Sequence, residues 1–264
     1  MTARLRKTVA SLGLALLAVL SACTSYTEIP IETPISPKLD VSSFQRIFIA
    51  GFIAGANEDV DANMETVRLL RSQLRNKGIM RVIDADTLPL LEVAKQNSAE
   101  ATPPPPDQQA APPQDQDKPP VFNDEKDLEP YQHLFANVAY WKRIGEEFQQ
   151  PLIVTGAILF APQQRSGFVQ REQETYDPFG RRIVVPVRTY QERKGFVLRP
   201  TFIFIDGRTG ETLHSETFRE EILYNANQQT PALSSYFELM DRLLPAFLNT
   251  LSAQKIKGTR TLLK

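Results

Sequence analysis

The chain has 264 residues, 42% of them hydrophobic, and a formal net charge of −1. A nearly neutral chain without a basic block gives no reason to expect a nucleic-acid partner. Cys23 is the only cysteine, and the two histidines, His133 and His214, are far apart in the sequence. The composition therefore favours neither a metal site nor a cofactor site.

The N-terminus has the pattern of a bacterial lipoprotein signal peptide. Three cationic residues precede an uncharged run of apolar and small residues over 9–20. A run of about a dozen residues is too short for a transmembrane helix, which needs about 20, but it suits a signal peptide. We predict that residues 1–22 are the signal and that Cys23 becomes the lipid-bearing, palmitoylated first residue. The lipobox before it is Leu20, Ser21 and Ala22.

The lipid predicts where the protein resides. Two or three acyl chains on one residue anchor a protein stably, whereas a single chain is marginal. Thr24 follows Cys23, and in enterobacterial-type sorting it is Asp at this position that retains a lipoprotein in the inner membrane. We therefore predict attachment to the periplasmic face of the outer membrane. An ordinary signal peptide with a chance cysteine is the alternative.

The mature chain is predicted to be a tether followed by one domain. Residues 23–42 hold several prolines and no helical period, which is typical of an extended tether. We assign residues 43–264 to a single periplasmic domain. Residues 97–120 hold eight of the 20 prolines and no aromatic or β-branched aliphatic residue, so we predict a disordered or polyproline insertion there.

The first half of the domain predicts a β-α-β unit. The apolar run in 43–52 favours a strand, and IMRVI at 79–83 favours a second one. Between them the apolar spacing predicts a helix that begins at Asn63, a candidate N-cap, and ends at Gly78. Such a crossover implies a mixed α/β (α+β) architecture with helices packed on a mixed sheet.

The second half predicts one more helix, a core strand and two hairpins. The helix is expected over 130–148 and the strand over 151–160. Two charged, alternating stretches form a hairpin over 161–195, because Asp, Pro and Gly occupy the favoured positions of a turn at 177–180. A second hairpin joins 196–205 to 211–224. The C-terminal helix is expected over 232–251, with Pro245 kinking or splitting it.

This element order resembles the periplasmic domain of the curli secretion-channel (CsgG-like) lipoproteins and of related lipoproteins that activate peptidoglycan synthases. The likeness rests on FQRIFIAGF at 44–52, PLIVTGAILF at 151–160, the DGRTGE turn within 202–224, and the lipobox. It implies a CsgG-like fold and an outer-membrane location. None of these motifs is a catalytic signature.

The curli channels contribute two membrane hairpins per subunit, and the sequence departs from them at both sites. The second site holds only residues 225–231, whereas a membrane strand needs about 9–11 residues each way. In 167–176 both alternating registers carry charge, and each central charge facing lipid costs about 2–4 kcal/mol. Pore formation is therefore not carried over from the resemblance.

We expect no enzyme. The carboxylate pairs Glu172/Glu174 and Glu220/Glu221 alternate or adjoin on exposed strands and have no partner base, and no glycine-rich phosphate loop or nucleophile elbow is present. The hairpin at 161–195 is the distinctive feature, because arginine and tyrosine are enriched at protein interfaces. An extension of the domain's own sheet is the alternative reading of this hairpin. The interaction candidates are Arg171, Tyr176, Phe179, Arg181, Arg182, Arg188 and Tyr190.

Three functions remain open from the sequence. The first is a lipid-anchored interaction or scaffold protein that docks on an unidentified periplasmic or outer-membrane partner. The second is an auxiliary lipoprotein that binds lipid or a small molecule for an envelope transporter, which a deep apolar pocket would favour. The third is a subunit of a homo-oligomeric secretion ring.

Overall fold

The computed structural model describes residues 26–55, 60–101, 120–225, 227–228 and 231–263. The chain divides into two compact units, residues 38–252 and a smaller unit of residues 1–37 with 253–264. The predicted lipid site at Cys23 and the lipobox lie outside the described residues, as do residues 102–119 of the predicted insertion. No helix in the described part of the chain is long and apolar enough to cross a bilayer.

The smaller unit is a two-stranded antiparallel pair. β1 (Tyr26–Ile35) pairs along its whole length with β9 (Gln254–Leu263), and Lys255 Nζ lies 3.1 Å from a carboxylate oxygen of Glu32. Residues 26–35 of the predicted tether are therefore a paired strand. Residues 253–264 belong to this unit and not, as predicted, to the domain that begins at residue 43. Local sequence patterns do not predict this pairing, because the two strands are far apart in the sequence.

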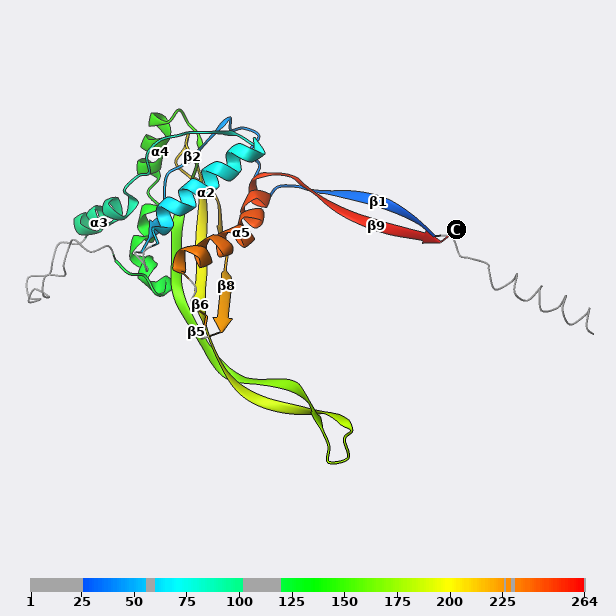
Figure 1. The fold of residues 1–264 in the computed structure, drawn as a ribbon. Helices are drawn as coiled ribbons and strands as arrows, with labels where there is room; N and C mark the ends of the chain where they lie inside the picture. Colours follow the sequence, from blue (N-terminus) through cyan, green and yellow to red (C-terminus); the bar gives the residue numbers. More distant parts are fainter. Residues whose placement is uncertain (1–25, 56–59, 102–119, 226, 229–230, 264) are drawn as a thin grey trace, which may run out of the picture. The chain divides into compact units, whose positions relative to one another are not determined.

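The larger unit is built on a seven-stranded mixed sheet with the order β4-β2-β5-β6-β7 (Figure 1). β3 also pairs with β5, and β8 pairs with β6 beyond the end of β7. The pairs β2–β4, β2–β5 and β3–β5 are parallel, and the remaining pairs are antiparallel. The strands are β2 (Arg46–Ile49), β3 (Ile53–Ala54), β4 (Arg81–Val82), β5 (Leu152–Tyr176), β6 (Arg182–Asp206), β7 (Thr212–Thr217) and β8 (Glu220–Asn225).

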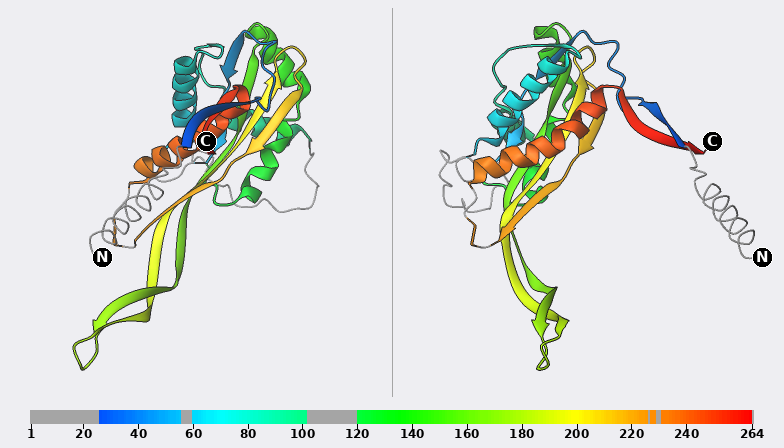
Figure 2. Two further views of the ribbon diagram at one scale, coloured as in Figure 1. Left: turned by 90° about the vertical axis from the view of Figure 1, so that its right-hand side faces the viewer. Right: turned by 45° about the vertical axis from the view of Figure 1, so that its right-hand side comes forward.

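Helices cover both faces of this sheet (Figure 2). α2 (Ala62–Lys77) and α5 (Ala232–Leu251) pack on one face, where Phe202 and Phe247 belong to the same buried cluster. α3 (Leu90–Ala101), the 3-10 helix η1 (Glu125–Leu134) and α4 (Val138–Glu147) supply the cluster on the other face, which contains the fully buried Trp141. The predicted mixed α+β fold with helices packed on a mixed sheet is confirmed.

The ends of α2 follow from local side-chain chemistry. The cap at its start is Asp61, whose carboxylate accepts a hydrogen bond from the Met64 amide at 2.9 Å, and not Asn63 as predicted. Asn63 lies inside the helix, and its side-chain oxygen accepts a hydrogen bond from the Phe52 amide at 2.8 Å. Gly78 ends the helix in the left-handed conformation, with φ of 63°, as predicted.

Several other boundaries differ from the sequence-based expectation. α3 was not predicted, and its last turn takes in residues 97–101 of the predicted insertion. The helix expected over 130–148 is instead η1 and α4, because Asn137 caps a new helix by accepting a hydrogen bond from the Tyr140 amide. α5 is one continuous helix through Pro245 and is not split. The strand expected over 211–224 is divided into β7 and β8.

Candidate functional site: an exposed two-stranded ribbon

β5 and β6 form one antiparallel hairpin whose outer half extends beyond the helices. Their pairing is continuous from Leu152 opposite Asp206 to Tyr176 opposite Arg182. The neighbouring strand β8 ends with Asn225 opposite Arg193. From there outward the two strands pair only with each other in the described structure (Figures 1 and 2). We call residues 166–192 the ribbon; at about 3.3 Å per residue it is about 35 Å long.

Polar contacts hold the base of the ribbon to the rest of the sheet. Arg165 Nη1 lies 3.2 Å from a carboxylate oxygen of Glu221, and the Gln191 side chain donates a hydrogen bond to Asn225 at 2.7 Å. Both contacts join the hairpin to β8. These contacts supplement the backbone pairing where the ribbon leaves the sheet.

The turn at the tip is organised around Asp177. Its carboxylate accepts hydrogen bonds from the backbone amides of Phe179 at 2.9 Å and Arg181 at 2.8 Å, and from Arg181 Nε at 2.8 Å. The hydrogen bond from the Arg181 amide is the largest cause that holds the pKa of Asp177 below its ordinary value. Gly180 has a φ of 76° and donates its amide to the Asp177 carbonyl, so the turn predicted at 177–180 is confirmed.

Pro186 and Pro200 of β6 lie at positions where the missing backbone amide does not remove a hydrogen bond to β5. The Pro200 carbonyl accepts from the Phe218 amide at 2.9 Å, so the backbone groups of Pro200 point away from β5. The pairing of β5 with β6 is unbroken, and every second residue therefore points the same way. Pro186 accordingly has its missing amide on the free outer edge, where proline is tolerated.

The pairing register sorts the side chains of the ribbon onto two chemically different faces. The even-numbered face continues the side of the sheet that α5 covers, and it carries the strand aromatics and all the glutamates of the ribbon. The odd-numbered face is β-branched, with Arg171 as its one charged residue. The even face holds Phe168, Glu172, Glu174, Tyr176, Tyr190 and Glu192; the odd face holds Val169, Arg171, Ile183, Val185 and Val187.

Large apolar side chains of the ribbon are exposed to solvent. Phe179 at the tip is 82% exposed and Phe168 is 74% exposed. Phe168 lies directly opposite Tyr190, and their ring centroids are 5.4 Å apart in an edge-to-face arrangement. The Arg181 guanidinium lies 5.6 Å from the centroid of the Phe179 ring. The cross-strand pair and the contact within the turn add order to the ribbon, while Phe168 and Phe179 stay mostly exposed.

All the interaction candidates predicted from the sequence lie on the ribbon and are exposed, but they do not share one face. Tyr176, Arg182, Arg188 and Tyr190 are on the even face, Arg171 is on the odd face, and Phe179 and Arg181 form the turn. Sequence reasoning missed the exposed residues Phe168, Ile183 and Val185. They would have been found by pairing the two strands residue by residue, because the pairing places the valines of β6 on the same face as Val169 of β5.

One group of titratable side chains away from the ribbon is centred on Glu216. Among the described residues no cluster of histidine, cysteine and acidic side chains could hold a metal ion. His214 Nε2 lies 3.4 Å from Glu216, which also accepts hydrogen bonds from Thr250 and Lys38. Burial raises the pKa of Glu216, but these three hydrogen bonds outweigh burial and lower it. Glu216 therefore acts as a structural tie between β7, α5 and the start of the larger unit.

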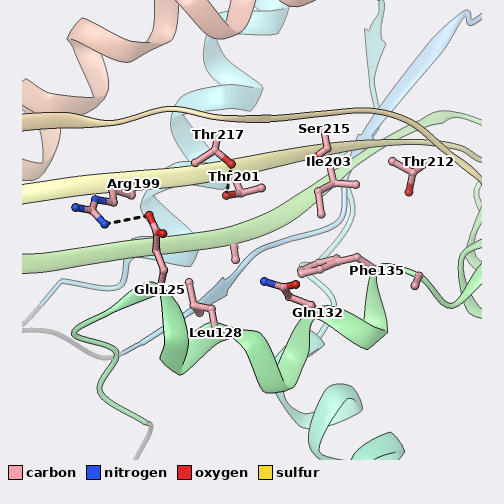
Figure 3. A pocket seen from close by; sticks show the side chains of 12 residues that line it. Glu125, Leu128, Gln132, Phe135, Arg199, Thr201, Ile203, Thr212, Ser215 and Thr217 are labelled. Carbon is pink, nitrogen blue, oxygen red and sulfur yellow. Dashed lines mark hydrogen bonds and ion pairs between the residues drawn. The ribbon is translucent and has the colours of Figure 1, made fainter.

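A cavity of about 450 Å³ lies between η1 and the exposed parts of β6 and β7 (Figure 3). Its floor is apolar, with Ala157 and Ile203 from the sheet and Phe135 next to η1. Its rim is polar and includes the ion pair of Arg199 with Glu125, whose atoms are 3.0 Å apart. Hydroxyl and amide groups complete the lining, from Thr201, Thr212, Ser215, Thr217 and Gln132.

Comparison with known proteins adds little. No protein-family model and no curated protein matches the chain. Five chains of solved structures match, among them lipoprotein GNA1162 from Neisseria meningitidis, at 11% identity and a TM-score of 0.33 over 77% of this chain and 98% of that one. The CsgG-like resemblance stays a prediction from the sequence.

Proposed function

We propose that the protein is a lipid-anchored interaction protein on the periplasmic face of the outer membrane, and that it docks on another envelope protein through the ribbon. The observation that carries this proposal is the exposure of Phe168, Tyr176 and Phe179, each more than 70% exposed, on a ribbon that none of the described helices covers. The role proposed is that of a scaffold without catalysis.

The energetics of the ribbon favour a partner. A two-stranded hairpin alone in water is marginally stable, since it buries little apolar surface against the entropy of ordering two strands. The apolar surface of the aromatic and β-branched side chains named above would be buried only if the ribbon bound another molecule. A long exposed edge of unpaired backbone also invites association. Its glutamates, arginines and Pro186 counter indiscriminate pairing and leave room for a specific one.

The charges of the ribbon supply the specificity of docking. Within the hairpin, Arg182 pairs with Glu174 and Arg181 with Asp177, so part of the charge is satisfied internally. No ion pair of Arg171 or Arg188 is found among the described residues. Guanidinium groups of this kind form charge-assisted, often bidentate hydrogen bonds with carboxylates of a partner. The membrane attachment in this proposal rests on the lipobox and on Cys23 alone.

The test is crosslinking in intact envelopes followed by recovery of the protein. The variant replaces Arg171, Arg181, Arg182 and Arg188 together by Ser. Folding should be retained, since surface substitutions usually cost under about 0.5 kcal/mol each. Recovery of the partner that the wild type captures should fall about tenfold or more, because charge-assisted contacts are worth about 1.5–3 kcal/mol each.

A matched control separates docking from a general effect of charge. It replaces four exposed arginines outside the ribbon by Ser and should leave partner recovery within about twofold, since single rim charges contribute little. Equal loss in both variants would contradict the proposal. Conductance steps from the pure protein in a lipid bilayer would favour a pore instead. The control residues are Arg68, Arg81, Arg143 and Arg242.

A further inference from the structure

β7 is an edge strand of the sheet, and part of its backbone is unpaired. In the sheet order it has only β6 as a neighbour. Glu216 of β7 lies opposite Phe202 of β6. Two residues further along, the Phe218 amide donates a hydrogen bond to the Pro200 carbonyl. Even-numbered residues of β7 therefore point their backbone groups at β6. The amides and carbonyls of Ser215 and Thr217 point outward, and no backbone partner for them exists among the described residues.

The cavity beside η1 opens onto the same strand. The side chains of Ser215 and Thr217 project to the side of the sheet where η1 lies, and both line the cavity (Figure 3). A strand added to the outer edge of β7 would project every second side chain to that same side. Unpaired backbone groups and an adjacent hollow are the two parts of a strand-addition site: the backbone bonds give affinity and the hollow gives specificity.

We propose that the β7 edge binds an extended segment of another protein as an additional strand, with one side chain of that segment seated in the cavity. This site is separate from the ribbon and does not depend on the docking proposed there. Edge strands in natural proteins are commonly protected by lysine, proline or covering loops. The sequence of β7, TLHSET, contains no lysine and no proline.

The lining of the cavity defines the chemistry of the seated side chain. Its two charged residues, Arg199 and Glu125, are paired with each other, so the cavity has no net charge to offer a ligand. The groups that remain are the hydroxyls, the Gln132 amide and the buried Nε of Arg199, which has no hydrogen-bond partner among the described residues; they lie above an apolar floor. A neutral side chain with a polar end, such as Thr or Gln, can contact the apolar floor and also form hydrogen bonds with the polar groups of the lining. At about 450 Å³ the cavity is far larger than one such side chain and also admits ordered water.

The experiment selects phage-displayed random peptides on the full-length protein and measures binding of the enriched peptides by fluorescence anisotropy. Ser215→Pro removes one outward amide without removing a bond to β6, and it should weaken binding about tenfold or more. Ser215→Ala keeps the backbone amide and removes one hydroxyl of the cavity lining, so it should weaken binding less than Ser215→Pro does. The matched proline control is Val184→Pro, another outward position on β6 far from the cavity, which should bind like wild type.

Thermal melting monitors folding of each variant. If Ser215→Pro does not fold, Ser215→Lys replaces it, because an inserted edge lysine opposes strand addition and leaves the backbone intact. Enriched uncharged peptides that lose affinity on these substitutions support the proposal. The proposal is overturned if no peptide is enriched, or if the enriched peptides bind Ser215→Pro as well as wild type. It is also overturned if the wild type self-associates and Ser215→Pro abolishes this association, because the edge would then bind a second copy of the chain.

Discussion

The inner and outer halves of the β5–β6 hairpin have the same backbone pairing and opposite environments. In the inner half, residues 152–161 of β5 are all buried between two layers of helices. In the outer half, the ribbon, most side chains of the same two strands are exposed. The pairing register does not change between the halves. Backbone pairing alone therefore does not determine what each half does; the side chains and their neighbours decide it.

The residues of a single strand, β5, account for this difference in environment. LIVTGAILFA in the inner half is a continuous apolar run, as expected for a strand covered on both faces. From Gln163 onward the strand alternates polar, charged and aromatic residues, which a strand without helices on its faces can accommodate. The inner half therefore contributes to the core, whereas most side chains of the outer half remain in contact with solvent.

The largest contrast is expected from truncating one aromatic residue in each half of β6. Phe202 is fully buried, with the Phe247 ring centroid 4.7 Å away, and Phe202→Ala should lower the free energy of unfolding by about 3–5 kcal/mol. Tyr190 is 57% exposed, and Tyr190→Ala should cost less than about 1 kcal/mol. Urea unfolding measures both values. Equal losses would mean that the ribbon is packed as part of the core.

A smaller contrast is expected between two glycines of β5. Gly156 has a φ of 144°, and a Cβ there would lie 1.8 Å from the Thr201 carbonyl oxygen. Gly156→Ala should therefore cost at least about 1–3 kcal/mol, the usual cost of a strained backbone. A Cβ on Gly167 in the ribbon would meet no atom within 4 Å, so Gly167→Ala should stay within about 0.5 kcal/mol of wild type. Thermal unfolding of the two variants checks this difference.

The smallest effect is a response of the ribbon turn to acid. The pKa of Asp177 is held below its ordinary value in the folded protein, chiefly because its carboxylate accepts a hydrogen bond from the Arg181 amide. The stabilisation is fully present above the unfolded pKa and is lost as the pH falls through the folded pKa. Amide exchange at the tip, relative to the intrinsic exchange rate at each pH, should therefore rise below the ordinary aspartate pKa of about 3.9, before exchange in β2 or the inner half of β5 changes. Asp177→Asn should abolish this pH dependence, and a simultaneous rise in the core would contradict it.

Local sequence patterns determined much of the fold. The apolar run of the inner half, the turn at Asp177 and the Gly78 helix end all follow from interactions within a few residues, and the structure has each of them. The C-terminal helix was predicted with its observed bounds because its apolar stripe repeats over five turns. The exposure of the candidate arginines also followed from their charged, alternating surroundings.

Only the tertiary structure decided the remaining features, since each depends on residues distant in the sequence. The pairing of β1 with β9 joins the two ends of the described chain, and neither strand has an apolar run from which it could be predicted. The two faces of the ribbon exist only once Phe168 is set opposite Tyr190, because a shift of one residue would exchange them. The free edge of β7 and the cavity beside η1 likewise arise from the order of strands in the sheet and from the helix that covers part of one face.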